Sequence, residues 1–474
     1  MPDEPAAPED RAAPDVRPPA DPGLGFLDRA LSWITPVERG EGTSALVLAL
    51  DVCVLLCAYY VLKPVREGLI LSEASGAELK SYAAVGQILL LIPIVPAYSW
   101  LVGRVERGRL IRTVTLVFVA CLVAFYFAAK LQVPGLGILF FLWVGIFNLM
   151  VVAQFWAFAS DLYSRRQGER LFPIVAFGAS MGAVAGSQLT SLLVKPLGIS
   201  QMMLVSAGLL LVALFLSRAA ERVTARCQLS TAALALRKKA GAGAAVAEGA
   251  GVVAAEAKPD QAPRKGAFRL VLQSRYLLLI GVLMLLLNLV NSTGEFVLGS
   301  LVKESVPAGV DAKEHISAFY SRYFLWVNLI GAVIQLFVTP RVLRRYGVAG
   351  ALLVLPTVAL LGYATIALVP FLFVARWGKI AENSLDYSLN NTVRNALFLP
   401  LGSEEKYKAK QVVDTLFVRG GDVASAGLVF LGRHLFALPL SVFALVNAVA
   451  AALWFWVAWQ LGREYATTSE STHR

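Results

Sequence analysis

Ionisable side chains in this sequence gather in four clusters that lie inside strongly apolar stretches. They occur within YYVLKPVREGLIL at 59–71, NLVNSTGEF at 288–296, RWGKIAENSLDYSLNNTVRN at 376–395 and VVDTLFVRGGD at 412–422. A charge at the centre of a membrane helix costs roughly 2.5–3.5 kcal/mol on insertion scales, so charges in such places indicate function. Arg binds phosphate groups through paired hydrogen bonds and Lys binds them as a point charge. Clustered cations with nearby acids therefore predict a binding site for a phosphorylated anion.

The first cluster surrounds a proline in an apolar helix. Pro64 has no backbone N–H and is predicted to interrupt the helix. Lys63, Arg66 and Glu67 then lie at a discontinuity, where side chains can turn toward a water-filled cavity. The alternative is that the membrane span ends at Leu62 and that these charges lie at the membrane surface.

The second cluster has the spacing of one helical face. Asn288, Asn291 and Glu295 are separated by three and four residues, so their side chains project from the same side of a helix. A polar stripe on an apolar helix is predicted to face a cavity or the interior of a helix bundle. Hydrogen bonds that hold neighbouring helices together are the alternative role.

The third cluster is the densest. Its members recur every three or four residues, at Arg376, Lys379, Asn383, Asp386, Asn390 and Arg394. Glu382 flanks this stripe and can form a salt bridge with Lys379. We predict that the stripe lines an anion-binding cavity, in which Glu382 and Asp386 balance the cations between binding events.

The fourth cluster is a pair. Arg419 and Asp422 are three residues apart in an otherwise apolar helix, with Gly420 and Gly421 between them. The pair is predicted to add a cation and a compensating acid to the same cavity. A purely internal ion pair is the alternative.

The composition requires that the helices carrying these clusters lie in lipid. Hydrophobic residues make up 57% of the 474 residues, against roughly 45–50% in soluble proteins. Charged residues make up 16% against roughly 25%, and the mean hydropathy is +0.65. These values exclude a water-soluble enzyme, a disordered scaffold and a disulfide-rich secreted module. The net charge of +11 is typical of basic cytoplasmic loops, and no nucleic-acid partner is expected.

Apolar runs set the predicted architecture, because a membrane-spanning helix needs about 20 apolar residues. The runs lie near 44–62, 82–102, 113–130, 136–158, 172–194, 202–217, 276–299, 320–339, 349–368, 370–392, 412–431 and 437–461. We predict an all-α polytopic membrane protein with twelve transmembrane helices in two six-helix bundles. In the fifth run, GASMGAVAGS at 178–187 has glycine at every fourth position and predicts close helix packing.

Loop charges and composition set the predicted domains and orientation. Lys and Arg concentrate in the loops after the second, fourth, eighth and tenth runs, so both termini are expected in the cytoplasm and the chain in a bacterial inner membrane. The predicted parts are a disordered tail with a short interfacial helix at 1–43, an N-terminal bundle at 44–217, a flexible cytoplasmic linker at 218–275, a C-terminal bundle at 276–461 and a cytoplasmic tail at 462–474.

Other chemistries lack their motifs in this sequence. The four cysteines and three histidines are scattered, so neither a disulfide framework nor a metal site is expected. No Walker A motif, Rossmann glycine fingerprint or nucleophile elbow occurs. We therefore expect neither an enzyme nor a bound cofactor.

Several of these segments resemble one family of transporters. YYVLKPVREGLIL, FWAFASDLYSRRQGERLFPIVAFGASMGAVAGS at 155–187, NLVNST at 288–293 and RNALFLPLGSEEKYKAKQVVDTLFVRGGD at 394–422 are similar to the ATP/ADP translocases of plastids and obligate intracellular bacteria. This family is a branch of the major facilitator superfamily. The similarity runs in order from about residue 44 to 460. It implies a carrier that exchanges ATP, ADP and related nucleotides.

The resemblance also assigns roles to single residues. The essential lysine of the family falls on Arg66, with a further basic residue at Lys63, and a second lysine falls on Arg394. Other positions differ in charge. An acidic residue of the family falls on Asn291, with Glu295 one turn later, and a lysine falls on Asp422, although Arg419 is retained.

The predicted function is nucleotide antiport, or transport of a related phosphorylated anion, by alternating access of a monomeric carrier. The residues expected to bind substrate are Lys63, Arg66, Asn291, Arg376, Lys379, Asn390, Arg394 and Arg419. Those expected to compensate charge or couple transport are Glu67, Glu295, Glu382, Asp386 and Asp422. Two alternatives remain open: a proton-coupled major-facilitator permease for another organic solute, and a membrane sensor or scaffold that transports nothing.

Overall fold

The computed structural model describes residues 26–32, 35–38, 41–102, 104–105, 107–241, 267–401 and 403–472, and these residues are almost entirely helical. The first helices are α1 (Phe26–Leu31), α2 (Glu41–Leu71), α3 (Gly76–Val102), α4 (Arg107–Lys130), α5 (Leu136–Leu162), α6 (Arg165–Leu197) and α7 (Ile199–Gly241). The later helices are α8 (Ala267–Gln273), α9 (Arg275–Glu304), α10 (Ala312–Val333), α11 (Thr339–Ala351), α12 (Val354–Leu368), α13 (Leu372–Leu385), α14 (Asn391–Ala396), α15 (Ser403–Val412), α16 (Val418–Phe430) and α17 (Leu440–Thr472).

Four single π-helical turns interrupt the later helices: η1 (Ile334–Val338), η2 (Asp386–Asn390), η3 (Val413–Phe417) and η4 (Leu431–Leu435). Such turns widen the backbone locally and are frequent at functional sites. Here η2 carries two residues of the predicted polar stripe, and η3 lies one turn before Arg419.

Membrane-spanning helices account for most of the chain. Among the described residues, ten helices are long and apolar enough to cross a membrane. α12 is apolar but has only 15 residues. α13 continues through η2 into α14, and this segment carries the polar stripe. The protein is therefore an all-helical integral membrane protein, as predicted, whereas the count of twelve spans stays a prediction.

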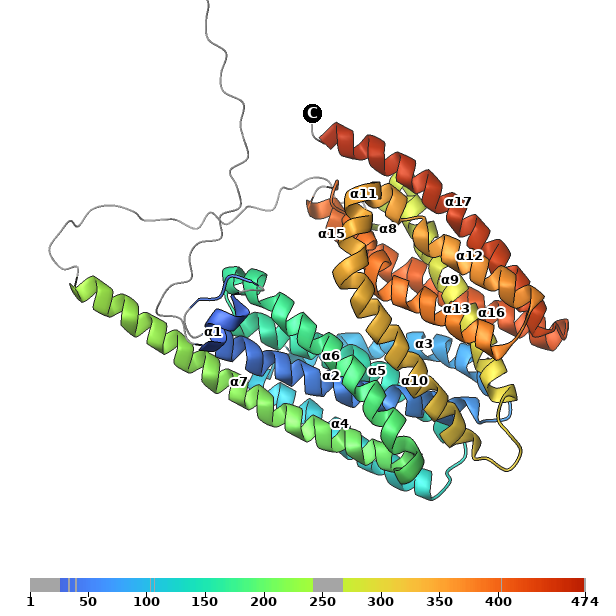
Figure 1. The fold of residues 1–474 in the computed structure, drawn as a ribbon, viewed down its shortest axis with the longest axis horizontal. Helices are drawn as coiled ribbons and strands as arrows, with labels where there is room; N and C mark the ends of the chain where they lie inside the picture. Colours follow the sequence, from blue (N-terminus) through green and yellow to red (C-terminus); the bar gives the residue numbers. More distant parts are fainter. Residues whose placement is uncertain are drawn as a thin grey trace, which may run out of the picture.

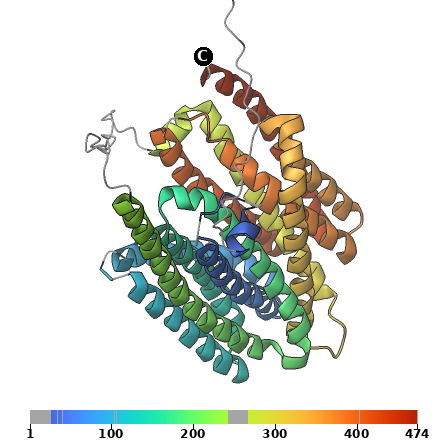
Figure 2. The same cartoon turned by 60° about the vertical axis from the view of Figure 1, so that its left-hand side comes forward.

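Two groups of helices can be followed in Figure 1, one from α1 to α7 and one from α8 to α17. We call them the N-terminal and C-terminal halves. They meet where α10 packs against α2 and α6, and where α3 packs against α9 and α16. The turned view in Figure 2 also shows the two halves side by side. Residues on α2, α3, α9 and α10 can therefore meet between the halves.

Glycines in α6 allow it to approach α2 closely. A Cβ atom at Gly178, Gly182 or Gly186 would overlap the backbone carbonyl groups of Ala49, Cys53 and Cys57, respectively. Larger residues would force the two helices apart. The predicted role of the glycine ridge in close packing is therefore confirmed.

The predicted break at Pro64 is wrong, because α2 continues through this proline to Leu71. Proline removes one hydrogen bond inside the helix, but neighbouring helices can hold a proline-containing helix in place within a membrane. α2 packs against α5, α6, α7 and α10. The Pro64 carbonyl also accepts a hydrogen bond from Ser317 Oγ of α10 at 3.1 Å. Lys63, Arg66 and Glu67 are therefore carried on a continuous helix.

The segments expected outside the bundles contain more helix than the sequence indicated. α7 extends to Gly241, and α8 and α9 begin at Ala267 and Arg275, so the expected linker at 218–275 is helical at both ends. Its central part, 242–266, lies outside the described residues, as do residues 1–25 and 473–474 of the two expected tails. The division into domains stays a prediction.

Candidate functional site

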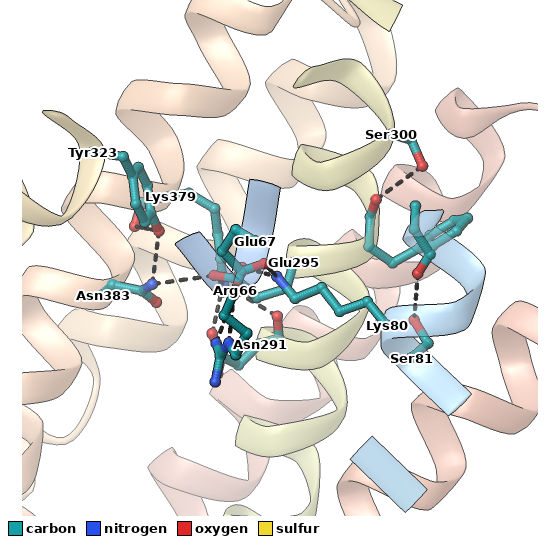
Figure 3. A network of polar contacts seen from close by, with 12 residues as sticks. Arg66, Glu67, Lys80, Ser81, Asn291, Glu295, Ser300, Tyr323, Lys379 and Asn383 are labelled. Carbon is teal, nitrogen blue, oxygen red and sulfur yellow. Dashed lines mark hydrogen bonds and ion pairs between the residues drawn. The ribbon is translucent and has the colours of Figure 1, made fainter. Parts of the chain in front are cut away.

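A largely buried network of ion pairs joins the two halves. It comprises Arg66 and Glu67 of α2, Lys80 of α3, Glu295 of α9 and Lys379 of α13, which we call the ion-pair network (Figure 3). Lys80 Nζ lies 2.7 Å from Glu67 Oε2 and 3.1 Å from Glu295 Oε2, so one lysine bridges an acid from each half. Arg66 Nε donates to Glu67 Oε1 at 3.2 Å. These five side chains form a continuous chain of opposite charges between the halves.

Lys379 contacts the polar residues that the C-terminal half contributes to this site. Its ammonium lies 3.1 Å from Glu382 Oε1 and 3.8 Å from Glu295 Oε1, and it donates to Asn291 Oδ1 at 2.6 Å. The lysine side chain is 1% exposed. Tyr363 donates its hydroxyl proton to Glu382 Oε2 at 2.7 Å. The predicted salt bridge between Lys379 and Glu382 is therefore present.

Neutral polar side chains fix the geometry around Glu295. Asn383 donates to Glu295 Oε1 at 3.3 Å, and its amide also donates to the Tyr323 hydroxyl at 2.7 Å. Tyr323 and Asn383 are buried. A carboxylate held by two lysines and an amide is fixed in direction.

Lys63 lies among aromatic rings instead of carboxylates. Its ammonium is 4.0 Å from the ring centre of Phe324, 5.1 Å from that of Tyr60 and 5.8 Å from that of Tyr387. These rings come from α10, α2 and η2, so both halves contribute. The Arg66 guanidinium lies 4.5 Å from the Phe141 ring centre. Aromatic faces attract cations without neutralising them, so the positive charge of Lys63 remains available to an anion.

The charges of these side chains do not cancel. Lys63, Arg66, Lys80 and Lys379 supply the cations, and Glu67, Glu295 and Glu382 supply the acids. Within this group, the cations exceed the acids by one. A buried group with excess positive charge, aromatic rings and hydrogen-bond donors has the chemistry needed to bind a phosphorylated aromatic anion.

Other contacts between the halves lie at the same end of the molecule, near residues 72–75 and 305–311, which we call the closed end. Lys303 of α9 donates to the carbonyl groups of Glu73 and Ala74. Glu78 Oε1 of α3 lies 3.0 Å from Arg433 Nε in η4. The ion-pair network therefore belongs to a larger set of contacts that close one end of the molecule.

The remaining predicted site residues lie outside this network. Arg376, one turn before Lys379, has its guanidinium 5.6 Å from the ring centre of Phe319. Asn390 donates to Asp386 Oδ1 at 2.7 Å. Arg394 lines a small pocket together with Lys410 and Asp414. Their assignment to substrate stays a prediction.

Arg419 and Asp422 form an ion pair, and their assignment to a binding cavity stays a prediction. Arg419 Nη1 lies 3.6 Å from Asp422 Oδ2, and Ser292 Oγ of α9 donates to Asp422 Oδ1 at 2.7 Å. The arginine side chain is 38% exposed. The pair is therefore only partly removed from solvent.

Sequence reasoning missed three contributors, Lys80, Tyr323 and Tyr363. Lys80 lies outside the apolar run predicted from residue 82, whereas α3 begins at Gly76. The segment GAELKSYAAVG contains no proline and continues the helical pattern, which was the available signal. The two tyrosines lie in apolar helices and carry no distinguishing pattern, because their partners are distant in sequence.

Solved structures of transporters share this arrangement of helices. The nucleoside transporter NupG, in a mutant form, aligns with a TM-score of 0.59 at 13% identity, covering 88% of this chain and 99% of that protein. A peptide transporter of the POT family in complex with sulfate aligns with a TM-score of 0.57 at 13% identity, covering 89% and 95%. These similarities show that this chain shares its helical fold with these transporters.

Curated relatives cover two thirds or more of the chain. ADP,ATP carrier protein 2 of Chlamydia trachomatis serovar D is 23% identical over 514 residues, which span 93% of this chain and 92% of the relative. ADP,ATP carrier protein 1 of Chlamydia pneumoniae is 24% identical over 68% of this chain and 66% of the relative. The sequence model of the TLC ATP/ADP transporter family matches residues 137–382, which cover half of the chain and include the glycine ridge, Glu295 and Lys379. The chain therefore belongs to the TLC ATP/ADP transporter family.

Proposed function

We propose that this carrier exchanges nucleotides of the ATP and ADP type across a membrane by alternating access. The observation that carries the proposal is the buried ion-pair network between the halves, with its excess of cations. Membership of the TLC family and the similarity to ADP,ATP carrier proteins support the choice of substrate. The negative phosphates would replace the glutamates as partners of the cations, which couples substrate binding to the opening of the network.

The proposed architecture has twelve spans in two six-helix bundles, with both termini in the cytoplasm of a bacterium and one chain per carrier. The basic loops support this orientation. In this orientation the closed end faces away from the cytoplasm. Lys63 and Arg66 from the N-terminal half and Lys379 from the C-terminal half would contact the phosphates. Tyr60, Phe324 and Tyr387 offer rings for an aromatic base.

Exchange, in place of one-way transport, follows from the cost of an empty site. Lys379 is engaged by Glu382, Glu295 and Asn291. An empty carrier must break such buried pairs to reopen, and breaking one typically costs about 3–5 kcal/mol. A nucleotide that binds from the other side of the membrane supplies new contacts for the cations. Transport of one nucleotide in one direction therefore depends on transport of a second nucleotide in the other direction.

Purified protein in proteoliposomes tests this function. Vesicles loaded with ADP should take up labelled ATP, and empty vesicles should take up far less. Uptake of ATP that requires an inward proton gradient would favour the proton-coupled alternative. The absence of flux for all nucleotides, with correctly folded protein, would contradict the proposal.

Arg66→Ala should reduce this exchange at least about tenfold, because a hydrogen bond to a charged group contributes about 1.5–3 kcal/mol. Arg66→Lys should retain part of the exchange, since it keeps the positive charge but not the planar fork. The uptake assay with both variants, at matched protein density, measures the difference. Equal exchange by Arg66→Ala and wild type would remove Arg66 from the substrate site.

Asp422→Asn should change thermal stability by less than about 1 kcal/mol, because its partner is partly exposed and such pairs contribute little. Asp422→Lys should shift binding toward more highly phosphorylated nucleotides, since it replaces a negative charge with a positive one beside Arg419. The measurement is the rise in melting temperature with the mono-, di- and triphosphate of one base. Identical shifts for wild type and Asp422→Lys would place Asp422 outside the binding site.

A further inference from the structure

A second polar site lies inside the N-terminal half, apart from the ion-pair network. A cavity of about 30 Å³ is lined by one polar side chain from each of four helices: Asp51 of α2, Thr115 of α4, Gln154 of α5 and Ser217 of α7. Apolar side chains that include Ile111, Phe155 and Leu214 complete its wall. Asp51 lies ten residues after the start of α2 at Glu41, or about 15 Å along the helix. The carboxyl group is therefore well inside a membrane span.

The hydrogen bonds of this cavity are incomplete. Ser217 Oγ donates to Asp51 Oδ2 at 2.7 Å. Asp51 Oδ1 and Gln154 Nε2 are buried and have no hydrogen-bond partner among the described residues. The two residues are 1% and 7% exposed. A cavity of this size holds one water molecule, which could accept from the amide and bond to the free carboxyl oxygen.

Charge balance is also missing around Asp51. The lining side chains of α4, α5 and α7 are neutral. The charged residues nearest to them in sequence on these helices, Arg112, Asp161 and Arg218, are exposed. On α2 the neighbouring titratable group is Cys53, and α6 presents glycines to this part of α2. An isolated carboxylate inside a membrane protein is costly, whereas a neutral carboxylic acid with hydrogen bonds is not.

We propose that Asp51 is a proton-binding site that holds one proton on Oδ1, with a cavity water bonded between this oxygen and Gln154. Releasing the proton converts the acid to a carboxylate and passes the proton to the cavity water and then to solvent. The site goes beyond nucleotide exchange, because it lies within one half and contacts none of the cations assigned to substrate. It ties α2 to α5 and α7, so its protonation stabilises the packing of the N-terminal half.

The expected pH dependence follows from this placement. The folded protein holds a proton that the unfolded chain releases at neutral pH, so stability should fall as pH rises through the range in which the folded carboxyl ionises. Asp51→Asn mimics the neutral acid and should fold. Its melting temperature should lack this part of the pH dependence. Asp161→Asn, the same change at an exposed position of α5, should keep it.

Infrared spectroscopy provides a direct readout. Wild-type protein at neutral pH should show the C=O stretching band of a buried carboxylic acid, and the band should be missing in Asp51→Asn and present in Asp161→Asn. Ser217→Ala should shift the frequency of the band, because it removes the hydrogen bond to Oδ2.

Two results would overturn the proposal. One is the absence of any carboxylic acid band that depends on Asp51. The other is a rise in melting temperature of the wild-type protein with sodium chloride but not with choline chloride. If Asp51→Asn abolishes this rise, the ligand is a small cation. Nucleotide exchange is not needed for either measurement, so failure of the proposed transport function would not affect them.

Discussion

Lys379→Met is expected to abolish nucleotide exchange and to lower the free energy of unfolding by about 3–5 kcal/mol, the usual cost of removing one partner of a buried pair. The lysine side chain is 1% exposed and lies 3.1 Å from Glu382 Oε1 and 3.8 Å from Glu295 Oε1. Without it, Glu382 keeps only the Tyr363 hydroxyl as a close polar partner among the described residues. Thermal unfolding in detergent and ATP uptake into ADP-loaded vesicles measure the two effects.

A double variant separates the structural role of Lys379 from its role in transport. Lys379→Met combined with Glu382→Gln removes both charges and should recover much of the lost stability. If Lys379 also contacts phosphate, exchange should remain absent in this stable double variant. Recovered exchange would show that the lysine only neutralises Glu382.

Lys130→Met is the matched control, because it makes the same change at an exposed lysine at the end of α4. Its melting temperature and exchange should stay close to those of wild type. A comparable loss in Lys130→Met would indicate a general effect of lost positive charge.

The membrane helices could be predicted from sequence because lipid imposes a simple requirement. Apolar length locates a span, and the runs at 136–158 and 276–299 lie within α5 and α9. Helix ends were less predictable, since hydropathy marks the part of a helix in lipid and not its full length. This is why Lys80 lies outside the predicted span although it lies within α3. The predicted break at Pro64 was wrong for a different reason. Packing of α2 against its neighbours outweighed the tendency of proline to interrupt a helix.

For the site, the sequence could predict only which side chains on one helix share a face. Asn291 and Glu295 share a helical face by spacing alone, and so do Lys379 and Asn383, so their common direction was available from the sequence. The pairing of Lys80 with Glu295 was not, because 215 residues separate them. The sequence also could not indicate which end of the carrier is closed, since an alternating carrier must be able to close either end.

Glu295→Gln is expected to open the closed end. The change keeps the shape of the side chain and removes its attraction to Lys80 at 3.1 Å and Lys379 at 3.8 Å. Hydrogen bonds to charged groups contribute about 1.5–3 kcal/mol, and every 1.4 kcal/mol changes a population ratio tenfold. The population that is open at this end should therefore rise roughly tenfold or more.

The thiol introduced by Ser317→Cys reports this opening. Ser317 is completely buried and bonds to the Pro64 carbonyl across the two halves, so a thiol there reacts only when α10 separates from α2. The background replaces Cys53, Cys57, Cys121 and Cys227, the four native cysteines. In this background, Glu295→Gln should increase the rate of maleimide labelling in nanodiscs roughly tenfold.

Glu304→Gln provides the control, because it removes an exposed glutamate at the same end of the same helix. It should leave the labelling rate unchanged. If Glu295→Gln also leaves it unchanged, the ion-pair network does not hold the closed end. In that case the other contacts there, Lys303 with the carbonyls of Glu73 and Ala74 and Glu78 with Arg433, must be sufficient to keep it shut. A second result would support competition for the lysines. If Glu295→Gln raises the labelling rate, and ATP also raises it in the Ser317→Cys protein that retains Glu295, then substrate and Glu295 compete for the same lysines, as exchange by alternating access requires.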